Sequence, residues 1–263
     1  MHVRAQDAAK DPQAYVRNVA QIELAAHAHP APRWQYLLEK RNAGGATTRE
    51  IIETREGLVA RLLTLNGQPL TAQVQRDEFA RLRALQNDPS QISKKLAGQE
   101  RDRERVLKMI RALPDAFLYA YDGTTSGPFG DEVRFSYKPN PRFSPDSVET
   151  QILRSMSGTL RIASKQQRLI ELRGTLTSDV SIGLGILGRV SKGGTLLLAQ
   201  SQLGPDSWEV TTLDLNVTGR ALFRTLDVSV YEHLTEFRPI SPAMSAQQAI
   251  DLLLQMPTAS GRQ

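Results

Sequence analysis

Apolar and polar residues alternate along much of this chain, which predicts that β-strands make up most of the fold. Met156, Leu160 and Ile162, for example, share one phase of the alternation, as in a strand with one buried face. The same pattern predicts roughly ten strands, at residues 34–40, 47–54, 58–65, 117–122, 132–138, 155–163, 168–177, 195–203, 207–218 and 221–237. Short turn-like gaps separate most neighbours, and we therefore expect mainly antiparallel pairing.

The strand pattern contains a break and a change of phase. The prolines within residues 139–145 cannot donate to a ladder, so the strand at 132–138 ends there and a connection follows. Later in the chain, the phase of the apolar positions changes between Val210 and Leu213. An extra residue in one strand produces such a change, and we predict a β-bulge near residues 211–212.

Helical periodicity predicts the remaining elements. Asp11 followed by Pro12 is typical of a helix start, and the apolar stripe of this helix runs through Tyr15, Val19, Ile22 and Ala26. Thr71 is a suitable N-cap for a helix that reaches about residue 86, and a second helix runs from Ser90 to about residue 113. Ser245 begins a capping box before a short C-terminal helix. Strands and separate helices together indicate an α+β fold.

The helical region at residues 71–113 is highly charged. Basic and acidic residues are interleaved in it, as in the sequence QERDRER at 99–105, which indicates a solvated surface with ion pairs along the helix. Phe79 is the one aromatic residue available to stack on a base, so we expect no nucleic-acid binding, but weak contact with an anionic membrane fits the charge. The last turns regain an apolar stripe from Val106 to Leu113, which predicts that this end packs against another element.

Composition narrows the class of protein without naming a function. The 263 residues are 40% apolar and 23% charged, with a net charge of +5, which is ordinary for a globular protein. The absence of cysteine excludes disulfides, thiolate metal sites and a cysteine nucleophile. The N-terminal residues have no apolar segment of the signal-peptide type, and a mature N-terminus from which a signal peptide has been removed is compatible with them.

Motifs that would indicate catalysis or cofactor binding are weak. Residues 183–188 match GxGxxG, but a dinucleotide site needs a helix directly after this motif, and the sequence predicts a turn there. The four histidines form no metal-binding motif, and no serine stands in a nucleophile elbow. Carboxylates such as Glu132 and Glu171 are not paired by any recognisable spacing. We therefore expect no cofactor, no metal and no enzymatic activity.

Several segments carry a resemblance to a known family. They are LNGQPLT at 65–71, LPD at 113–115, MSGTLRI at 156–162 and WEVTTLDLNVTGR at 208–220. With the opening helix and the charged insertion, they resemble uncharacterised envelope proteins related to the outer-membrane lipoprotein-sorting carriers, over most of residues 12–238. The long insertion distinguishes this chain from the carriers of that superfamily, and the absence of a lipid-attachment cysteine distinguishes it from the membrane-anchored receptors.

The resemblance implies a curved, mostly antiparallel, half-open β-barrel, with helices covering its concave face and a charged helical insertion at about 71–113. It implies a single domain over residues 12–257, with flexible termini at 1–11 and 258–263, in a periplasmic protein. The connection after residue 138 would then carry the chain between separate parts of the curved sheet. No catalytic residue is implied.

From the alternation and the resemblance, we expect a non-catalytic binding protein for an acyl chain, a lipoprotein or another apolar ligand. The expected cavity lining is Met156, Leu160, Ile162, Ile170, Leu172, Leu196 and Leu198, and the expected rim or membrane contact is Ile182, Leu184, Ile186 and Leu187. A fully packed core explains the same alternation equally well. Two further hypotheses stay open: an envelope sensor or scaffold that binds a protein partner through the charged helices, and a hydrolase that uses the cavity.

Overall fold

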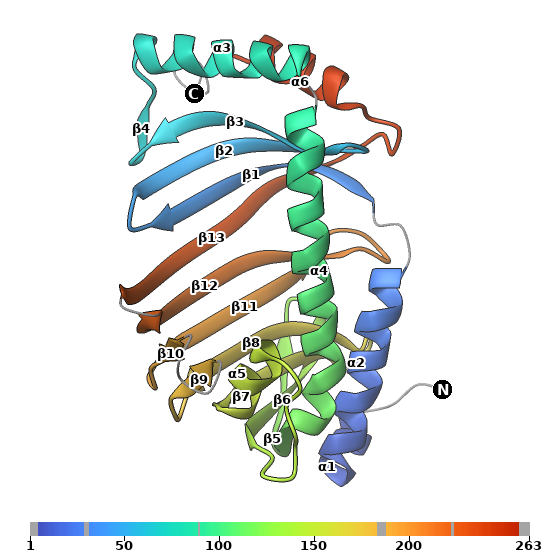
Figure 1. Cartoon of the computed structure of the whole chain (residues 1–263). Coiled ribbons are helices and arrows are strands. Elements are labelled where there is room, and N and C mark those ends of the chain that lie inside the picture. Colours follow the sequence, from blue (N-terminus) through green and yellow to red (C-terminus); the bar gives the residue numbers. More distant parts are fainter. Residues whose placement is uncertain (1–4, 29–31, 89, 183–187, 222–223, 258–263) are drawn as a thin grey trace. The chain divides into compact units, whose positions relative to one another are not determined.

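The computed structural model describes residues 5–28, 32–88, 90–182, 188–221 and 224–257 (Figure 1). This part of the chain has the α+β composition expected from the sequence, with six helices and thirteen strands. The strand pairs are antiparallel, and the sheet does not close into a barrel. The chain divides into two compact units, which we describe separately: unit 1 comprises residues 1–30 and 104–229, and unit 2 comprises residues 31–103 and 230–263.

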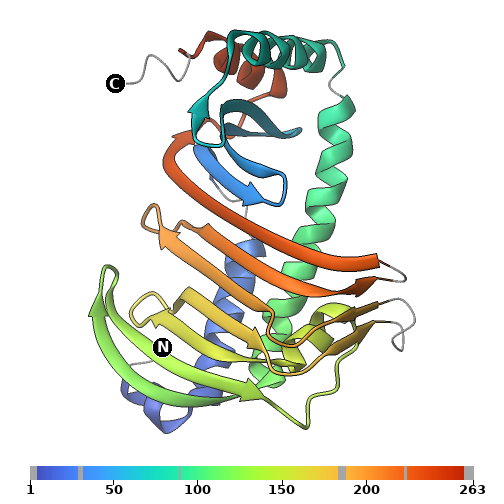
Figure 2. The same cartoon turned by 90° about the vertical axis from the view of Figure 1, so that its left-hand side faces the viewer.

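Unit 1 contains most of the strands. Its helices are α1 (Ala5–Lys10), α2 (Pro12–Ala28), α5 (Val148–Arg154) and residues 104–116 of α4 (Ser90–Ala116). Its strands are β5 (Phe117–Gly127), β6 (Gly130–Pro139), β7 (Met156–Ala163), β8 (Arg168–Leu176), β9 (Val180–Ile182), β10 (Gly188–Val190), β11 (Thr195–Gln202) and β12 (Trp208–Ala221). Hydrogen bonds order them β12-β11-β8-β7-β6-β5, as Figure 2 shows from the orange β12 to the green β5, and β10 pairs with β12 and β9.

The core of unit 1 lies between α2 and the strands β5 to β8. The predicted start of α2 is confirmed, because the backbone N–H of Ala14 donates to the side chain of Asp11 at 2.9 Å. Its buried residues are Tyr15, Val16, Val19, Ala20 and Glu23, whereas Ile22 and Ala26 of the predicted stripe are only half-buried. Tyr15 and Val19 contact a cluster that includes Phe117 and Phe135 from the sheet. The buried face is therefore turned toward residues 16, 20 and 23 relative to the prediction.

The segment between Pro139 and Met156 connects two neighbouring strands. The expectation that it crosses between separate parts of the sheet is wrong, because β6 and β7 pair with each other directly, for example through Phe135 and Leu160. The segment contains α5, which the sequence analysis did not predict. Ser147 caps this helix in a capping box with Thr150. The helix is short and directly follows a proline-rich segment, so the sequence around it predicts a turn more strongly than a helix.

The β-bulge predicted near residues 211–212 is confirmed. Ala199 on β11 pairs with Thr212 on β12, and Gln200 pairs with Val210, which leaves Thr211 as the extra residue. The apolar phase changes at this point because the bulge turns the following residues to the other face. The strands β9 and β10 were not predicted, and they pair antiparallel on either side of residues 183–187, which lie outside the described part of the chain. No helix follows the GxGxxG motif, in agreement with the rejection of a dinucleotide site.

Unit 2 combines a strand meander with helices packed on it. Its strands are β1 (Arg33–Asn42), β2 (Gly45–Thr54), β3 (Gly57–Leu65), β4 (Gln68–Pro69) and residues 230–240 of β13 (Arg224–Ile240), in the order β4-β3-β2-β1-β13. Its helices are α3 (Ala72–Asn87), α6 (Ala246–Gln255) and residues 90–103 of α4. The predicted caps are confirmed, since Thr71 accepts from Val74 N–H and Ser245 forms a capping box with Gln248.

A separate apolar cluster holds unit 2 together. Ile52 and Val59 from the sheet pack with Leu82 and Leu85 of α3 and with Ile250 of α6, all of them buried. The helices α3 and α6 contact each other and β3. Unit 2 therefore has its own core, which does not involve the pocket described below.

Residues 5–10, which the resemblance placed in a flexible segment, form α1, and Ala8 is fully buried. Residues 258–263 lie outside the described residues. The resemblance implies one domain over residues 12–257, and these residues are distributed over the two compact units. No helix within the described residues is long and apolar enough to cross a membrane.

Candidate functional site: an apolar pocket in unit 1

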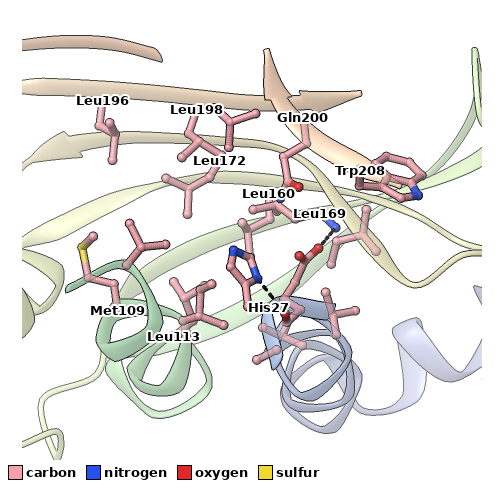
Figure 3. Close-up of a pocket in the computed structure, with 18 of the residues that line it drawn as sticks. His27, Met109, Leu113, Leu160, Leu169, Leu172, Leu196, Leu198, Gln200 and Trp208 are labelled. Carbon is pink, nitrogen blue, oxygen red and sulfur yellow. Dashed lines mark hydrogen bonds between the residues drawn. The ribbon is translucent and has the colours of Figure 1, made fainter. Parts of the chain in front are cut away.

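Unit 1 contains a partly enclosed pocket with a volume of about 180 Å³. Side chains from β7, β8, β11 and β12 form one wall, and side chains from α2 and from residues 106–113 of α4 form the other (Figure 3). The sheet wall includes Leu160, Ile162, Leu169, Leu172, Leu196, Leu198, Trp208 and Val210. The pocket is therefore a gap between helices and sheet within a single compact unit, lined mainly by branched apolar side chains.

The helix wall comes mainly from amphipathic stripes on two helices, and Leu153 of α5 adds to it. Val16, Val19 and Ala20 contribute from α2, and Val106, Met109, Ile110 and Leu113 contribute from α4. The prediction that the C-terminal end of the charged helix packs against another element is confirmed, because Met109 and Leu113 pack against the core cluster of unit 1. The same residues that fix this end of the helix thus form part of the pocket lining.

The structure brings together five of the seven predicted lining residues in this pocket, namely Leu160, Ile162, Leu172, Leu196 and Leu198. Met156 is buried in the core cluster and does not line the pocket; its side chain lies over Gly174, where an added Cβ would be 2.1 Å from Met156 Cε. Ile170 lies elsewhere because of a bulge: Arg161 pairs with Glu171 and Ile162 with Leu169, which leaves Ile170 unpaired between them.

The bulge in β8 decides which residue enters the pocket. Leu169 lines the pocket, although the period of two assigns it to the opposite face from Leu172. Ile170 packs instead in a small cluster with Ala163 and Trp208. Simple alternation fails here because a bulge shifts the phase of the strand by one residue.

The predicted rim segment is only partly described. Ile182 ends β9. Leu184, Ile186 and Leu187 lie outside the described residues. The proposed rim or membrane contact at these four residues stays a prediction.

A buried ion pair involves one residue of the lining, Glu23. Arg168 on β8 donates from Nε and Nη2 to the two carboxylate oxygens of Glu23 on α2, at 3.0 and 2.9 Å. The backbone N–H of Leu169 donates to the same carboxylate at 2.8 Å. Glu23 also lies in the lining of the pocket. Because the carboxylate is fully engaged with a guanidinium and an amide, it serves as a structural tie between helix and sheet.

Other polar groups of the lining lie near this pair. His27 Nδ1 donates to the backbone oxygen of Glu23, at 2.8 Å, which orients the ring beside the pocket (Figure 3). Gln200 on β11 and Glu209 on β12 also line the pocket. Burial raises the pKa of Tyr15, which lies about two turns before Glu23 on α2 and outside the lining, although the hydrogen bond from Gln167 opposes this shift. The pocket thus has an extended apolar part and a small polar part.

The polar residues of the lining were not predicted from the sequence, but Gln200 and Glu23 left a signal in it. Gln200 continues the phase of Leu196 and Leu198 on β11, so a polar residue stands where the alternation requires an apolar one. Glu23 follows Val16 and Val19 at helical spacing, which places a carboxylate on the buried face of α2. Polar residues in an apolar phase are informative because burying them requires a partner.

The chemistry that the pocket can carry out is limited by this lining. Its acidic and histidine side chains are Glu23, His27 and Glu209, and the described residues contain no group of three or more His, Cys, Asp or Glu placed to hold a metal ion. No serine or threonine occurs among the described residues of the lining. In comparisons with protein-family models, with curated proteins and with solved structures, nothing matches this chain.

Proposed function

We propose that unit 1 binds an apolar ligand, such as an acyl chain, in this pocket and performs no chemistry on it. The observation that carries the proposal is the pocket itself: about 180 Å³ between helices and sheet, lined mainly by leucine, isoleucine and valine side chains. A cavity of about 150 Å³ with a similar lining binds a molecule of the size of benzene. The volume is therefore sufficient for part of an alkyl chain, with the rest extending through the open side.

The expected affinity follows from apolar burial. Each buried methylene contributes ~0.8 kcal/mol, so a chain that inserts about eight methylenes gains about 6 kcal/mol before the loss of its translational freedom. Dissociation constants in the micromolar to millimolar range are the expected result for an isolated alkyl ligand. A larger lipid or lipoprotein that touches more of the unit would bind more tightly.

The finer description of the fold belongs to the same proposal. In it, the strands β7, β8, β11 and β12 form the concave face of a half-open barrel, which α2 and the end of α4 cover. What supports this arrangement is the lining of the pocket, which draws residues from these strands and from both helices. The resemblance to envelope proteins supplies the proposed location, the periplasm, and the proposed ligand class, the acyl chain of a lipid or lipoprotein.

The proposal is tested by filling the pocket with a side chain. Leu198 lines the pocket, whereas the adjacent Leu197 lies beside Arg173 and Asp214, which line a separate surface groove. Leu198→Trp should weaken binding of N-phenyl-1-naphthylamine, an uncharged fluorescent apolar probe, about tenfold or more, and Leu197→Trp should not change it. Equal binding by the two variants would contradict the proposal. Native mass spectrometry and organic extraction of the purified protein would identify a ligand that co-purifies.

A second function, binding of a protein partner through the charged helices, is favoured by the exposure of every residue from 100 to 106 on α4. Deletion of residues 71–113 cannot separate the two functions, because Val106, Met109 and Leu113 line the pocket. The double charge reversal of Arg101→Glu with Glu104→Arg keeps the net charge and leaves the lining intact. Loss of a partner from in vivo cross-links with unchanged probe binding would support this second function.

A further inference from the structure

Gln200 is a polar residue of the lining whose side-chain amide has no hydrogen-bond partner among the described residues. It is 8% exposed, lines the pocket from β11, and its side-chain amide forms no hydrogen bond with any described residue. Figure 3 shows the side chain pointing from the strand toward the helices. An amide has two donor hydrogens and an acceptor oxygen, and in a residue that is buried as a whole these groups normally have partners.

The other polar groups of the pocket restrict what that partner can be. The charge of Glu23 is balanced by Arg168, so this pair offers no net charge to a ligand. Glu209 adds a carboxylate, and the described lining contains no lysine or arginine. A ligand carboxylate or phosphate beside Gln200 would therefore lose its hydration without gaining a cation from an arginine or lysine of this lining.

We infer that Gln200 is the recognition residue for a neutral hydrogen-bonding group on an amphiphile whose alkyl chain occupies the pocket. The chemical class is an amide, an ester or an alcohol; an amide or alcohol both donates to and accepts from Gln200, and an ester accepts from it. The site discriminates against the free carboxylate of a fatty acid. This inference rests on the proposed function and adds to it the class of ligand.

The experiment measures how well octanamide, octan-1-ol and octanoate displace N-phenyl-1-naphthylamine from the full chain. These three competitors share one alkyl length, so their differences report the head group. The wild-type chain should bind octanamide and octan-1-ol about tenfold or more tightly than octanoate. Gln200→Leu should weaken octanamide about tenfold relative to the probe, and Gln200→Met, with an unbranched side chain of similar length, should do the same if the leucine variant folds poorly.

Gln202→Leu is the matched control. Gln202 belongs to the same strand, donates to the backbone oxygen of Pro205 at 3.0 Å and does not line the pocket, so its replacement should leave all three competitors unchanged. If all three proteins bind the probe and the Gln200 variants rank the three competitors as the wild type does, the inference about Gln200 is wrong, but the proposed function stands. Tighter binding of octanoate than of octanamide would also overturn it. Failure of the wild-type chain to bind the probe would overturn both.

Discussion

Glu23 and Arg168 form a buried ion pair with two hydrogen bonds, which fastens α2 to β8 beside the pocket. The side chains are 4% and 9% exposed, so solvent screens their interaction very little. The guanidinium also lies over the ring of Trp208, with 5.7 Å between its carbon and the ring centre. The pair thus links a helix, a strand and an aromatic side chain of the lining.

Removing one partner of this pair should be costly. We expect Glu23→Ala to lower the free energy of unfolding by about 3–5 kcal/mol, because it leaves the charge of Arg168 buried without compensation. Glu23→Leu combined with Arg168→Met removes both charges and should be less destabilised than Glu23→Ala. Urea denaturation of the three proteins measures the difference. A double variant no more stable than the single one would show that the charge of Arg168 is not the cause.

The glycine pair Gly158 and Gly174, on β7 and β8, offers a test of close packing. A Cβ at Gly158 would stand 1.9 Å from the backbone oxygen of Arg173, whereas a Cβ at Gly174 would meet the end of the Met156 side chain at 2.1 Å and the Tyr137 hydroxyl at 2.6 Å. Side-chain ends can move, but the paired backbone cannot. We therefore expect Gly158→Ala to destabilise by about 3 kcal/mol and Gly174→Ala by about 1–2 kcal/mol.

Thermal and urea denaturation of the two alanine variants tests this order. Gly193→Ala is not a suitable reference, because Gly193 has a φ of 87° and strain would add to packing. Gly98, in the middle of α4 and with nothing within 4 Å of an added Cβ, is a better one, since alanine there should be neutral or stabilising. Equal losses at positions 158 and 174 would mean that the backbone at Arg173 adjusts.

Alkaline pH should destabilise unit 1 through two tyrosines, the buried Tyr137 and the half-buried Tyr119. The hydroxyl of Tyr119 donates to Leu113 O at 2.8 Å, and that of Tyr137 donates to Arg173 O at 2.9 Å. Burial raises the pKa of both, because a phenolate would lose its hydration there. In the unfolded chain a tyrosine titrates near pH 10, so above that pH the unfolded state binds fewer protons. The stabilisation is complete below about pH 10 and falls as pH rises toward the raised values.

The tyrosine effect is measured by urea denaturation between pH 8 and pH 11. Each tyrosine contributes a slope that approaches ~1.4 kcal/mol per pH unit above its unfolded pKa. Tyr119→Phe should be about 1 kcal/mol less stable at pH 8, because it lacks the hydrogen bond to Leu113. It should lose stability less steeply than the wild type above pH 10. Parallel pH profiles of the two proteins would show that Tyr119 does not contribute.

In unit 2, Arg61 should be essential for the end of α6. Its side chain is buried, donates to the backbone oxygens of Leu253 and Met256 at 2.6 and 2.8 Å, and stacks on Phe79 at 4.9 Å. These carbonyls belong to the last turn and C-cap, where a helix has no partners of its own. We expect Arg61→Met to destabilise by about 2–4 kcal/mol and to speed amide hydrogen exchange in α6, with little change in probe binding to unit 1. Unchanged exchange in α6 would contradict this role.

Short-range signals in the sequence determined much of the secondary structure. The caps at Asp11, Thr71 and Ser245 are local, because each side chain reaches a backbone N–H only three residues away. The bulge at Thr211 was also predictable, because the shift in phase is visible in the strand itself. The α5 helix was missed because its cap is embedded in a proline-rich connection whose strongest signals are turns.

The alternation also determined which face of each strand is buried, and this placed Leu160, Leu172 and Leu198 together in one pocket. Only the tertiary structure decided the rest. Alternation does not state whether a buried face meets packed side chains or a gap, and the bulge that moved Ile170 out of the pocket arises from the pairing of two strands. The unpartnered amide of Gln200 becomes evident only when its neighbours are known, because satisfaction of a polar group depends on contacts between residues far apart in the chain.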